Sequence, residues 1–289
     1  MDFLRPDSWA DALAAKSEHP DAVPIAGGTD VMVELNFDRR RPTALIDLTR
    51  VRDLSQWYEQ DGLIRLGAGV TFARLISDLG DQLPGLAMAS RTVGSPQIRN
   101  RGTVGGNLGT ASPAGDAHPA LLAAGAEVEL DSVRGSRRMP VADFYLGVKR
   151  NALQPDELIR AIWIAPATGP QQFSKIGTRN AMVIAVCAFG LALHPDRKAV
   201  GTGIGSAAPT PRIAAEAGAF VGNALEEAGL WESRGALPLS LAKEFGEQVR
   251  GAADPIDDVR GTAAYRLHSL SVMARRCLVW AWNDYRQAA

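Results

Sequence analysis

The glycine-rich stretch Arg99–Asp116 limits what this chain can fold into more than any other segment. Glycine reaches positive φ and lets a ligand approach the main chain closely. With hydroxyl side chains beside it, such a stretch can expose a row of backbone N–H donors suited to a phosphate or pyrophosphate. A permissive surface loop has the same composition, so the stretch alone leaves both interpretations open. Its glycines are Gly102, Gly105, Gly106, Gly109 and Gly115.

Length and composition indicate a globular protein with a substantial core. The chain has 289 residues, enough for one large domain or two ordinary ones. Its hydrophobic content is 46% and its charged content 22%, as in soluble domains. A net charge of −1 argues against a nucleic-acid partner, which needs a basic surface. We therefore expect no nucleic-acid binding.

The cysteines and the apolar segments exclude several further classes. Cys187 and Cys277 lie ninety positions apart, which gives neither a disulfide framework nor metal-ligand spacing. An iron–sulfur cluster needs about four thiolates, so we expect no metal site here and interpret Cys277 as a core thiol. No segment reaches the roughly 18 apolar residues of a membrane span, and the first residues lack the apolar region of a signal peptide. A cytoplasmic location without membrane insertion is the expectation.

A second glycine motif occurs near the start of the chain. A short strand over 23–25 ends at Gly27 and Gly28, followed by Thr29, Asp30 and an apolar segment. This order is typical of a phosphate cradle, and equally of a tight turn. The lysine of the ATPase loop and the third glycine of the dinucleotide fingerprint are both missing. The motif alone does not decide between cradle and turn.

Periodicity and turn residues predict the remaining elements of the first half. We expect helices over 8–18, capped by Asp7 or Ser8, and over 71–79, capped by Thr71, with strands over 44–48 and 63–69. A short helix that turns at Gly125 into a strand over 126–130 follows, then a helix over 140–145 and a strand over 157–164. The proline- and glycine-containing segment 165–170 is the candidate domain boundary.

The second half begins with strands and ends with helices. We expect strands over 173–176 and 181–193 and helices over 213–229, 239–250 and 262–285. The string GTGIGSAA at 201–208 matches a dinucleotide fingerprint in letters only. Pro209 and Pro211 follow it at once, so the helix that the fingerprint requires cannot open there.

Groups able to transfer protons or attack a substrate are scarce. No nucleophile elbow or histidine metal pair occurs. His118 is the only histidine near the glycine-rich stretch, and we expect it to be structural. Asp257 and Asp258 suit a helix start better than catalysis. We therefore predict no catalytic residue, and a chemistry supplied by a bound cofactor.

Four blocks carry a family resemblance. They are IAGGTD at 25–30, IRNRGTVGGNLGTASPAGDAHP at 98–119, FSKIGTRNAMVIAVCAF at 173–189 and DPIDDVRGTAAYRLHSLSVMARRCL at 254–278. In this order they resemble the FAD-binding middle subunit of the molybdenum hydroxylases of the xanthine dehydrogenase and carbon monoxide dehydrogenase type. The resemblance implies an α+β fold. A two-lobed FAD-binding domain of the PCMH or vanillyl-alcohol-oxidase type would span 1–168, and a small domain with a three-stranded antiparallel sheet and a helical bundle would span 169–289.

The resemblance also implies cofactor-binding residues. Two loops, with Gly28 and Gly105 77 positions apart, would close on one FAD from two sides. From the first loop these residues are Ile25, Ala26, Gly27, Gly28, Thr29, Asp30 and Val31. From the second they are Thr103, Gly105, Gly106, Asn107, Thr110 and Asp116. Ile159 and Lys175 complete the set, and the other three glycines of the stretch would only let the backbone turn.

As a function, the resemblance implies an FAD-carrying electron-transfer subunit. Partner chains, a small iron–sulfur subunit with 2Fe-2S clusters and a large molybdopterin subunit, would deliver electrons, in a dimer of heterotrimers. NAD would accept them, or another acceptor. The organic substrate, a purine or another small molecule, would bind in a partner. Two alternatives stay open: a stand-alone flavin-dependent oxidase or reductase acting directly on a small molecule, and a non-enzymatic scaffold with purely structural glycine loops.

Overall fold

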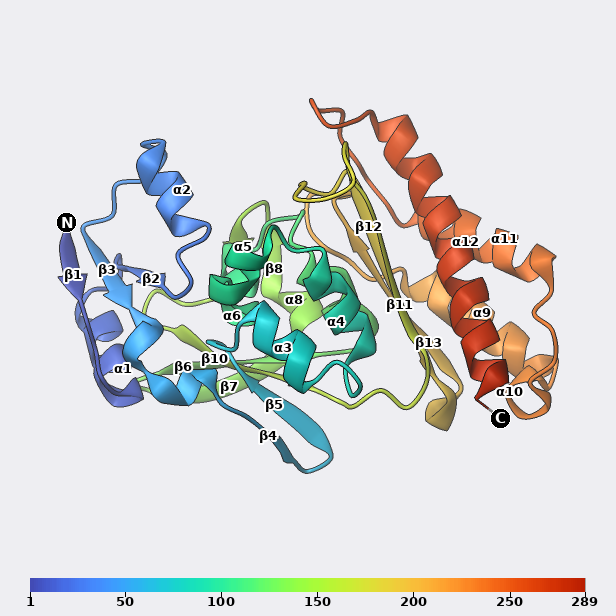
Figure 1. Cartoon of the computed structure of the whole chain (residues 1–289), viewed down its shortest axis with the longest axis horizontal. Helices are drawn as coiled ribbons and strands as arrows, with labels where there is room; N and C mark the ends of the chain where they lie inside the picture. Colours follow the sequence, from blue (N-terminus) through green and yellow to red (C-terminus); the bar gives the residue numbers. More distant parts are fainter. Residues whose placement is uncertain (289) are drawn as a thin grey trace.

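Helices and sheets alternate along the chain and form a mixed α+β structure, as the sequence predicts (Figure 1). The computed structural model describes residues 1–288. Its strands are β1 (Asp2–Leu4), β2 (Val23–Ile25), β3 (Ala44–Asp47), β4 (Trp57–Gln60), β5 (Leu63–Gly67), β6 (Glu127–Ser132), β7 (Gly135–Pro140), β8 (Tyr145–Gly147), β9 (Arg150–Asn151), β10 (Leu158–Ile164), β11 (Gln171–Ile176), β12 (Cys187–His194) and β13 (Ala199–Gly205). Its α-helices are α1 (Trp9–Glu18), α2 (Val31–Asn36), α3 (Phe72–Asp78), α4 (Pro84–Arg91), α5 (Pro96–Arg101), α6 (Val104–Thr110), α7 (Ala117–Ala123), α8 (Val141–Phe144), α9 (Ala215–Glu227), α10 (Leu230–Ser233), α11 (Leu239–Gly251) and α12 (Ala263–Gln287).

The first 164 residues build two lobes around separate sheets. The small lobe has a parallel sheet with the order β1-β3-β2. The second lobe has an antiparallel sheet with the order β4-β5-β10-β6-β7. Its buried face packs with α3, α4, α6 and α7 in one continuous hydrophobic core. This is the two-lobed arrangement that the resemblance implies.

Local capping explains where several helices begin. Ser8 caps α1, and Thr71 caps α3 by accepting a hydrogen bond from the Arg74 amide. Both helices therefore start where the sequence predicts, since a hydroxyl at the cap satisfies an otherwise free amide. Thr103 caps α6 in the same way, by accepting from the Gly106 amide at 3.0 Å.

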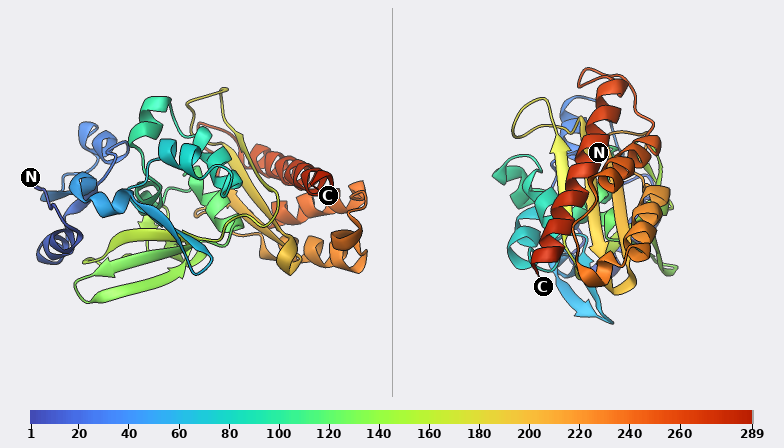
Figure 2. Two further views of the ribbon diagram at one scale, coloured as in Figure 1. Left: turned by 60° about the horizontal axis from the view of Figure 1, so that its bottom comes forward. Right: turned by 90° about the vertical axis from the view of Figure 1, so that its right-hand side faces the viewer.

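After the connection 165–170, the chain forms a third sheet, β11-β12-β13, covered by a helical bundle. Leu191 and Phe189 of β12 point into a core with α9, α11 and α12, and Figure 2 shows α12 crossing these strands. The other face is lined by glycines. A side chain on Gly203 would overlap the carbonyl oxygen of Pro119, because α7 lies directly on the sheet backbone.

This packing gives the string at 201–208 its role. The segment is strand β13 followed by a turn, and no helix opens there, as the two prolines predict. Because side chains alternate across a strand, Gly201, Gly203 and Gly205 share the face that α7 covers. These three glycines let the backbone of α7 pack directly on the backbone of the sheet.

Two sequence expectations are wrong in detail. The strand expected over 181–193 begins only at Cys187, because its partner β11 ends at Ile176, the residue that pairs with Cys187. Residues 181–186 therefore have no strand beside them. Also, Gly102, Gly109 and Gly115 do not adopt positive φ. A side chain on Gly115 would overlap the His118 ring, so this glycine provides space for packing.

Candidate functional site

The two glycine loops, far apart in sequence, lie against each other. A Cβ on Gly27 would overlap the carbonyl oxygen of Arg101, at the end of α5. Thr110 Oγ1 on α6 lies 3.3 Å from Asp30 Oδ2 in the first loop. The structure thus joins the first loop to the glycine-rich stretch at two places, one between backbones and one between side chains. Together they form one wall of a site.

The first loop presents backbone donors. Gly28 has a φ of +75°, which reverses the chain between β2 and α2. Within the described residues 1–288, the amides of residues 27–30 have no hydrogen-bond acceptor from the protein, and these residues are only partly buried. A group of free, partly shielded N–H donors fits an anion such as a diphosphate.

The second loop differs from the sequence interpretation. Instead of an extended loop with a row of free donors, residues 104–110 form the short helix α6. Its first amides are already bonded: Val104 N donates to Val70 O at 3.2 Å and Gly105 N to Ala68 O at 3.1 Å. The glycines serve close packing, since a Cβ on Gly105 would overlap Ala68. Helix α6 can therefore contact a ligand through its side chains, chiefly those of Asn107 and Thr110.

Asp116 and Lys175 form a buried ion pair between the glycine-rich stretch and β11. Lys175 Nζ lies 2.7 Å from Asp116 Oδ2 and donates to Thr92 O at 3.2 Å. Burial raises the pKa of Asp116 to about 6, although Lys175 opposes this. Asp116 Oδ1 is buried and has no partner among residues 1–288. A buried acceptor without a donor is costly, and a bound polar group would satisfy it.

Beside this pair lies a polar cluster of Asn107, His118 and Tyr145. Tyr145 Oη and His118 Nδ1 are 2.8 Å apart and fully buried. Burial lowers the pKa of His118 to about 3, so its ring is neutral at physiological pH. In the described part of the chain, Asn107 Oδ1 and His118 Nε2 lack hydrogen-bond partners. Both lie beside Gly115.

The buried histidine is hydrogen-bonded within the core. Its link to Tyr145 is a contact that the sequence did not reveal, because the two residues lie 27 positions apart in segments without a shared motif. The pair connects α7 to the start of β8 beneath the site.

Replacing Tyr145 by phenylalanine should destabilise the protein by about 1–3 kcal/mol, because His118 Nδ1 loses its partner inside the core. Urea unfolding of the two proteins measures the difference. Tyr265→Phe is the matched control, because Tyr265 is half exposed. Equal unfolding midpoints for Tyr145→Phe and the control would contradict this.

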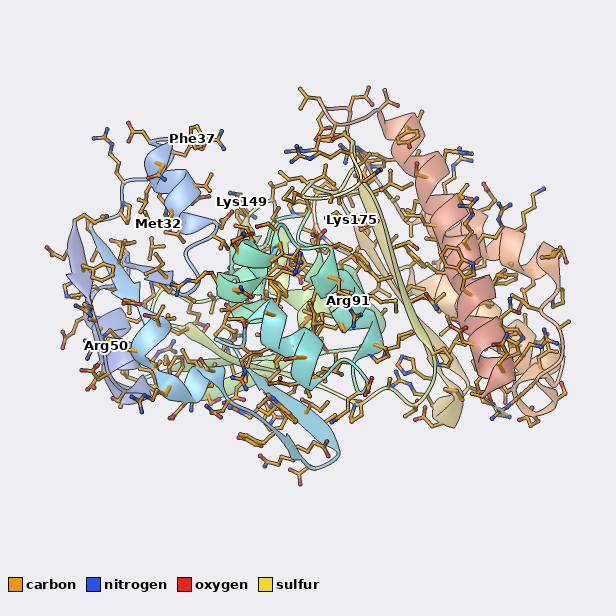
Figure 3. The ribbon with its side chains drawn as sticks, in the orientation of Figure 1. Met32, Phe37, Arg50, Arg91, Lys149 and Lys175 are labelled. Carbon is orange, nitrogen blue, oxygen red and sulfur yellow. The ribbon has the colours of Figure 1, made fainter. Side chains whose placement is uncertain are left out.

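Ile159 closes the site on its apolar side. It lies in β10 at a register shift opposite β6 and is 8% exposed. Its Cδ1 faces Gly109, 3.5 Å from where a Cβ would be. The predicted residues thus come together in one region: the first loop, α6 with Ile159, and Asp116 with Lys175, which Figure 3 labels on β11.

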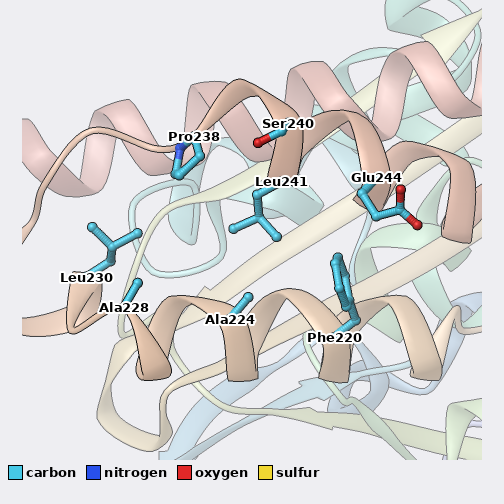
Figure 4. Close-up of a pocket in the computed structure, with 8 residues that line it drawn as sticks. All are labelled: Phe220, Ala224, Ala228, Leu230, Pro238, Ser240, Leu241 and Glu244. Atoms are coloured by element: carbon cyan, nitrogen blue, oxygen red, sulfur yellow. The ribbon is translucent and has the colours of Figure 1, made fainter.

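Other concave surfaces lie elsewhere. A cleft of about 440 Å³ opens between α9 and α11 of the bundle (Figure 4), and no predicted site residue lines it.

Among the described residues, no group of histidine, cysteine and carboxylate side chains is arranged to hold a metal ion. Cys277 is buried, with a thiol pKa that burial raises to about 11, as expected of a core thiol. Over residues 1–288 no helix combines the length and the apolar character of a membrane span.

The two-lobed fold, with a sheet-and-bundle domain behind it, is that of flavoprotein subunits of the PCMH type. A family model described as "FAD binding domain in molybdopterin dehydrogenase" matches residues 1–167. The chain belongs to this family, the FAD-binding subunits of the molybdenum hydroxylases, which are oxidoreductase components.

Individual relatives extend the similarity over nearly the whole chain. The chain is 35% identical over 211 residues to the nicotinate dehydrogenase FAD-subunit of Eubacterium barkeri, covering 70% of this chain and 71% of that protein. It is 32% identical over 286 residues to the carbon monoxide dehydrogenase medium chain of Afipia carboxidovorans, covering 96% and 95%. Among solved structures, reconstituted CO dehydrogenase from Oligotropha carboxidovorans contains a chain that matches with a TM-score of 0.87 at 29% identity, covering 98% of both chains.

Proposed function

We propose that this protein carries FAD and transfers electrons within a heteromeric molybdenum hydroxylase. Electrons arrive from the 2Fe-2S clusters of a small partner subunit, after substrate oxidation at a molybdopterin centre in a large one. They leave to NAD or another acceptor. A dimer of heterotrimers in the cytoplasm is the proposed assembly. Residues 1–168 would form the FAD-binding domain and residues 169–289 the second domain, a division supported by the family match over 1–167.

One observation chiefly supports this proposal: the amides of residues 27–30 have no acceptor in the described chain, and their loop contacts α6, where Asn107 Oδ1 is buried without a partner. The diphosphate of FAD carries two negative charges, and backbone donors can neutralise them without lysine. FAD supplies the electron-transfer chemistry when bound. Asn107, Thr110, Asp116 and Lys175 provide side-chain hydrogen-bonding groups, and Ile159 provides an apolar contact. We propose that Ile25–Val31, Thr103, Gly105 and Gly106 shape the site.

A spectrum of the purified chain tests the proposal. After FAD is added and excess removed, bands near roughly 370 and 450 nm are expected, as for a protein-bound flavin. NADH should then bleach the longer-wavelength band if NAD is the acceptor, because electron transfer between the two is reversible. A chain that binds no FAD even at high concentration would refute the proposed function. Oxidation of small molecules by the chain without partners would instead favour a stand-alone enzyme.

A further inference from the structure

An exposed apolar face lies beside the first glycine loop. It consists of Met32, Val33 and Phe37, on and just after α2, and Leu146 and Val148 of the β8–β9 hairpin. We call it the α2–hairpin face. These side chains are 43% to 70% exposed, and Figure 3 shows Met32 and Phe37 on α2 at one end of the molecule. Contiguous exposed apolar surface marks interaction sites in soluble proteins.

Helix α2 has little support from its own chain. It has six residues, and none of them is buried. A helix this short is unstable by itself in water, and tertiary packing normally supplies its stability. The exposed side of α2 is therefore expected to gain a partner.

The two parts of the face are held together. Lys149 Nζ in the hairpin lies 2.6 Å from Glu34 Oε1 on α2, and Lys149 N donates to Ala111 O, just after α6, at 3.1 Å. Figure 3 shows Lys149 between α2 and the central helices. The face is thus continuous with both segments of the candidate FAD site.

The rim of the face is basic, in contrast to the rest of the chain. Segments 31–41 and 145–151 contain five cationic residues and two carboxylates, whereas the whole chain has a net charge of −1. Arg39 lies over the Phe37 ring at 5.5 Å. The cationic residues are Arg39, Arg40, Arg41, Lys149 and Arg150.

We propose that the α2–hairpin face docks a partner subunit of the complex through a surface with an apolar centre and a rim of carboxylates. This proposal rests on the proposed function, since it requires the heteromeric complex. Opposite charge steers such an encounter and fixes its register. A second copy of this chain is disfavoured, because a two-fold contact would place the same basic rim on both sides.

The test co-expresses the full chain with its partner subunits and compares four variants. Phe37→Asp and Val148→Asp place a carboxylate in the face, and Arg39→Glu reverses one rim charge. Val259→Asp is the control, since Val259 is fully exposed and lies outside the α2–hairpin face, in the loop between α11 and α12. Complex formation is measured by gel filtration, and FAD affinity is measured on the chain alone.

We expect Phe37→Asp and Val148→Asp to weaken assembly about tenfold or more, as for central interface residues. Arg39→Glu should do so chiefly at low salt, where rim charges act most strongly. FAD affinity and the Val259→Asp complex should match the wild type. Normal assembly of Phe37→Asp and Val148→Asp would overturn the docking proposal. Loss of FAD affinity in these variants would also overturn it, because the α2–hairpin face would then bind the cofactor. Dimerisation of the isolated chain that Phe37→Asp abolishes would overturn it too, because the face would then bind a second copy of this chain. If the wild-type chain binds no FAD, the proposed function fails instead.

Discussion

Replacing Gly27 by alanine should lower FAD affinity about thirtyfold, equivalent to about 2 kcal/mol. The added methyl group would overlap the carbonyl of Arg101 and approach the amide of Gly102. Both are backbone atoms, so no side-chain rotation can relieve the overlap. The first loop must move away from the glycine-rich stretch, and its free amides then no longer face the other half of the site. Titration of the purified chain with FAD, followed by flavin fluorescence, measures the effect.

Gly251→Ala is the matched control for this experiment. Gly251 ends α11, and a Cβ there meets no atom within 4 Å. Its FAD affinity should equal that of the wild type. If Gly27→Ala binds FAD as tightly as the control, the contact between the loops is not needed for binding, and the two-sided site is wrong.

Burial of the Asp116 carboxyl should make the stability of the FAD-free protein pH-dependent, although Lys175 opposes the effect. Burial raises the pKa of Asp116 from 3.8 to about 6, so the folded state holds this proton more tightly than the unfolded state. The resulting stabilisation is fully present below pH 3.8 and is lost as the pH rises through 6. The shift corresponds to about 3 kcal/mol.

Asp116→Asn removes this titration. Between pH 4 and pH 7, the free energy of unfolding of the wild type should therefore fall by about 2 kcal/mol relative to that of Asp116→Asn. Urea unfolding at intervals of half a pH unit measures both curves, and other titrating groups cancel in the difference. A constant difference across this range would show that Asp116 has an ordinary pKa in the folded state.

Sequence patterns predicted most elements because local chemistry determines them. Ser8 and Thr71 are cap residues, and their helices begin as expected. The prolines after residue 208 exclude a helix there, and the structure has none before α9. Several elements escaped prediction, among them β4, β7, β13, α4 and α5, and two segments show opposite reasons for such errors. Strand β1 has only three residues, too few to show a period, and the apolar run 181–186 lacks a neighbouring strand although its composition suits one.

Within the site, the glycine-rich stretch also shows that composition alone does not determine local structure. Its composition allows either a loop with free amides or a packed helix, since glycine permits both. The surroundings decide: Ala68 and Val70 accept the amides of Gly105 and Val104, and α6 forms. The free amides occur in the first loop instead, where the two glycines alone did not distinguish a cradle from a turn.

By itself, the sequence determined the starts of several helices, the positions of the core strands and the family resemblance, because these depend on residue types and short spacings. Only the tertiary structure decided which amides remain free, that Gly27 touches Arg101, and that Asp116 meets Lys175. Those properties depend on contacts between residues far apart in the chain. Burial then sets the free energy of these contacts, because a polar atom or charge from which neighbouring elements exclude water is costly unless it has a hydrogen-bond partner.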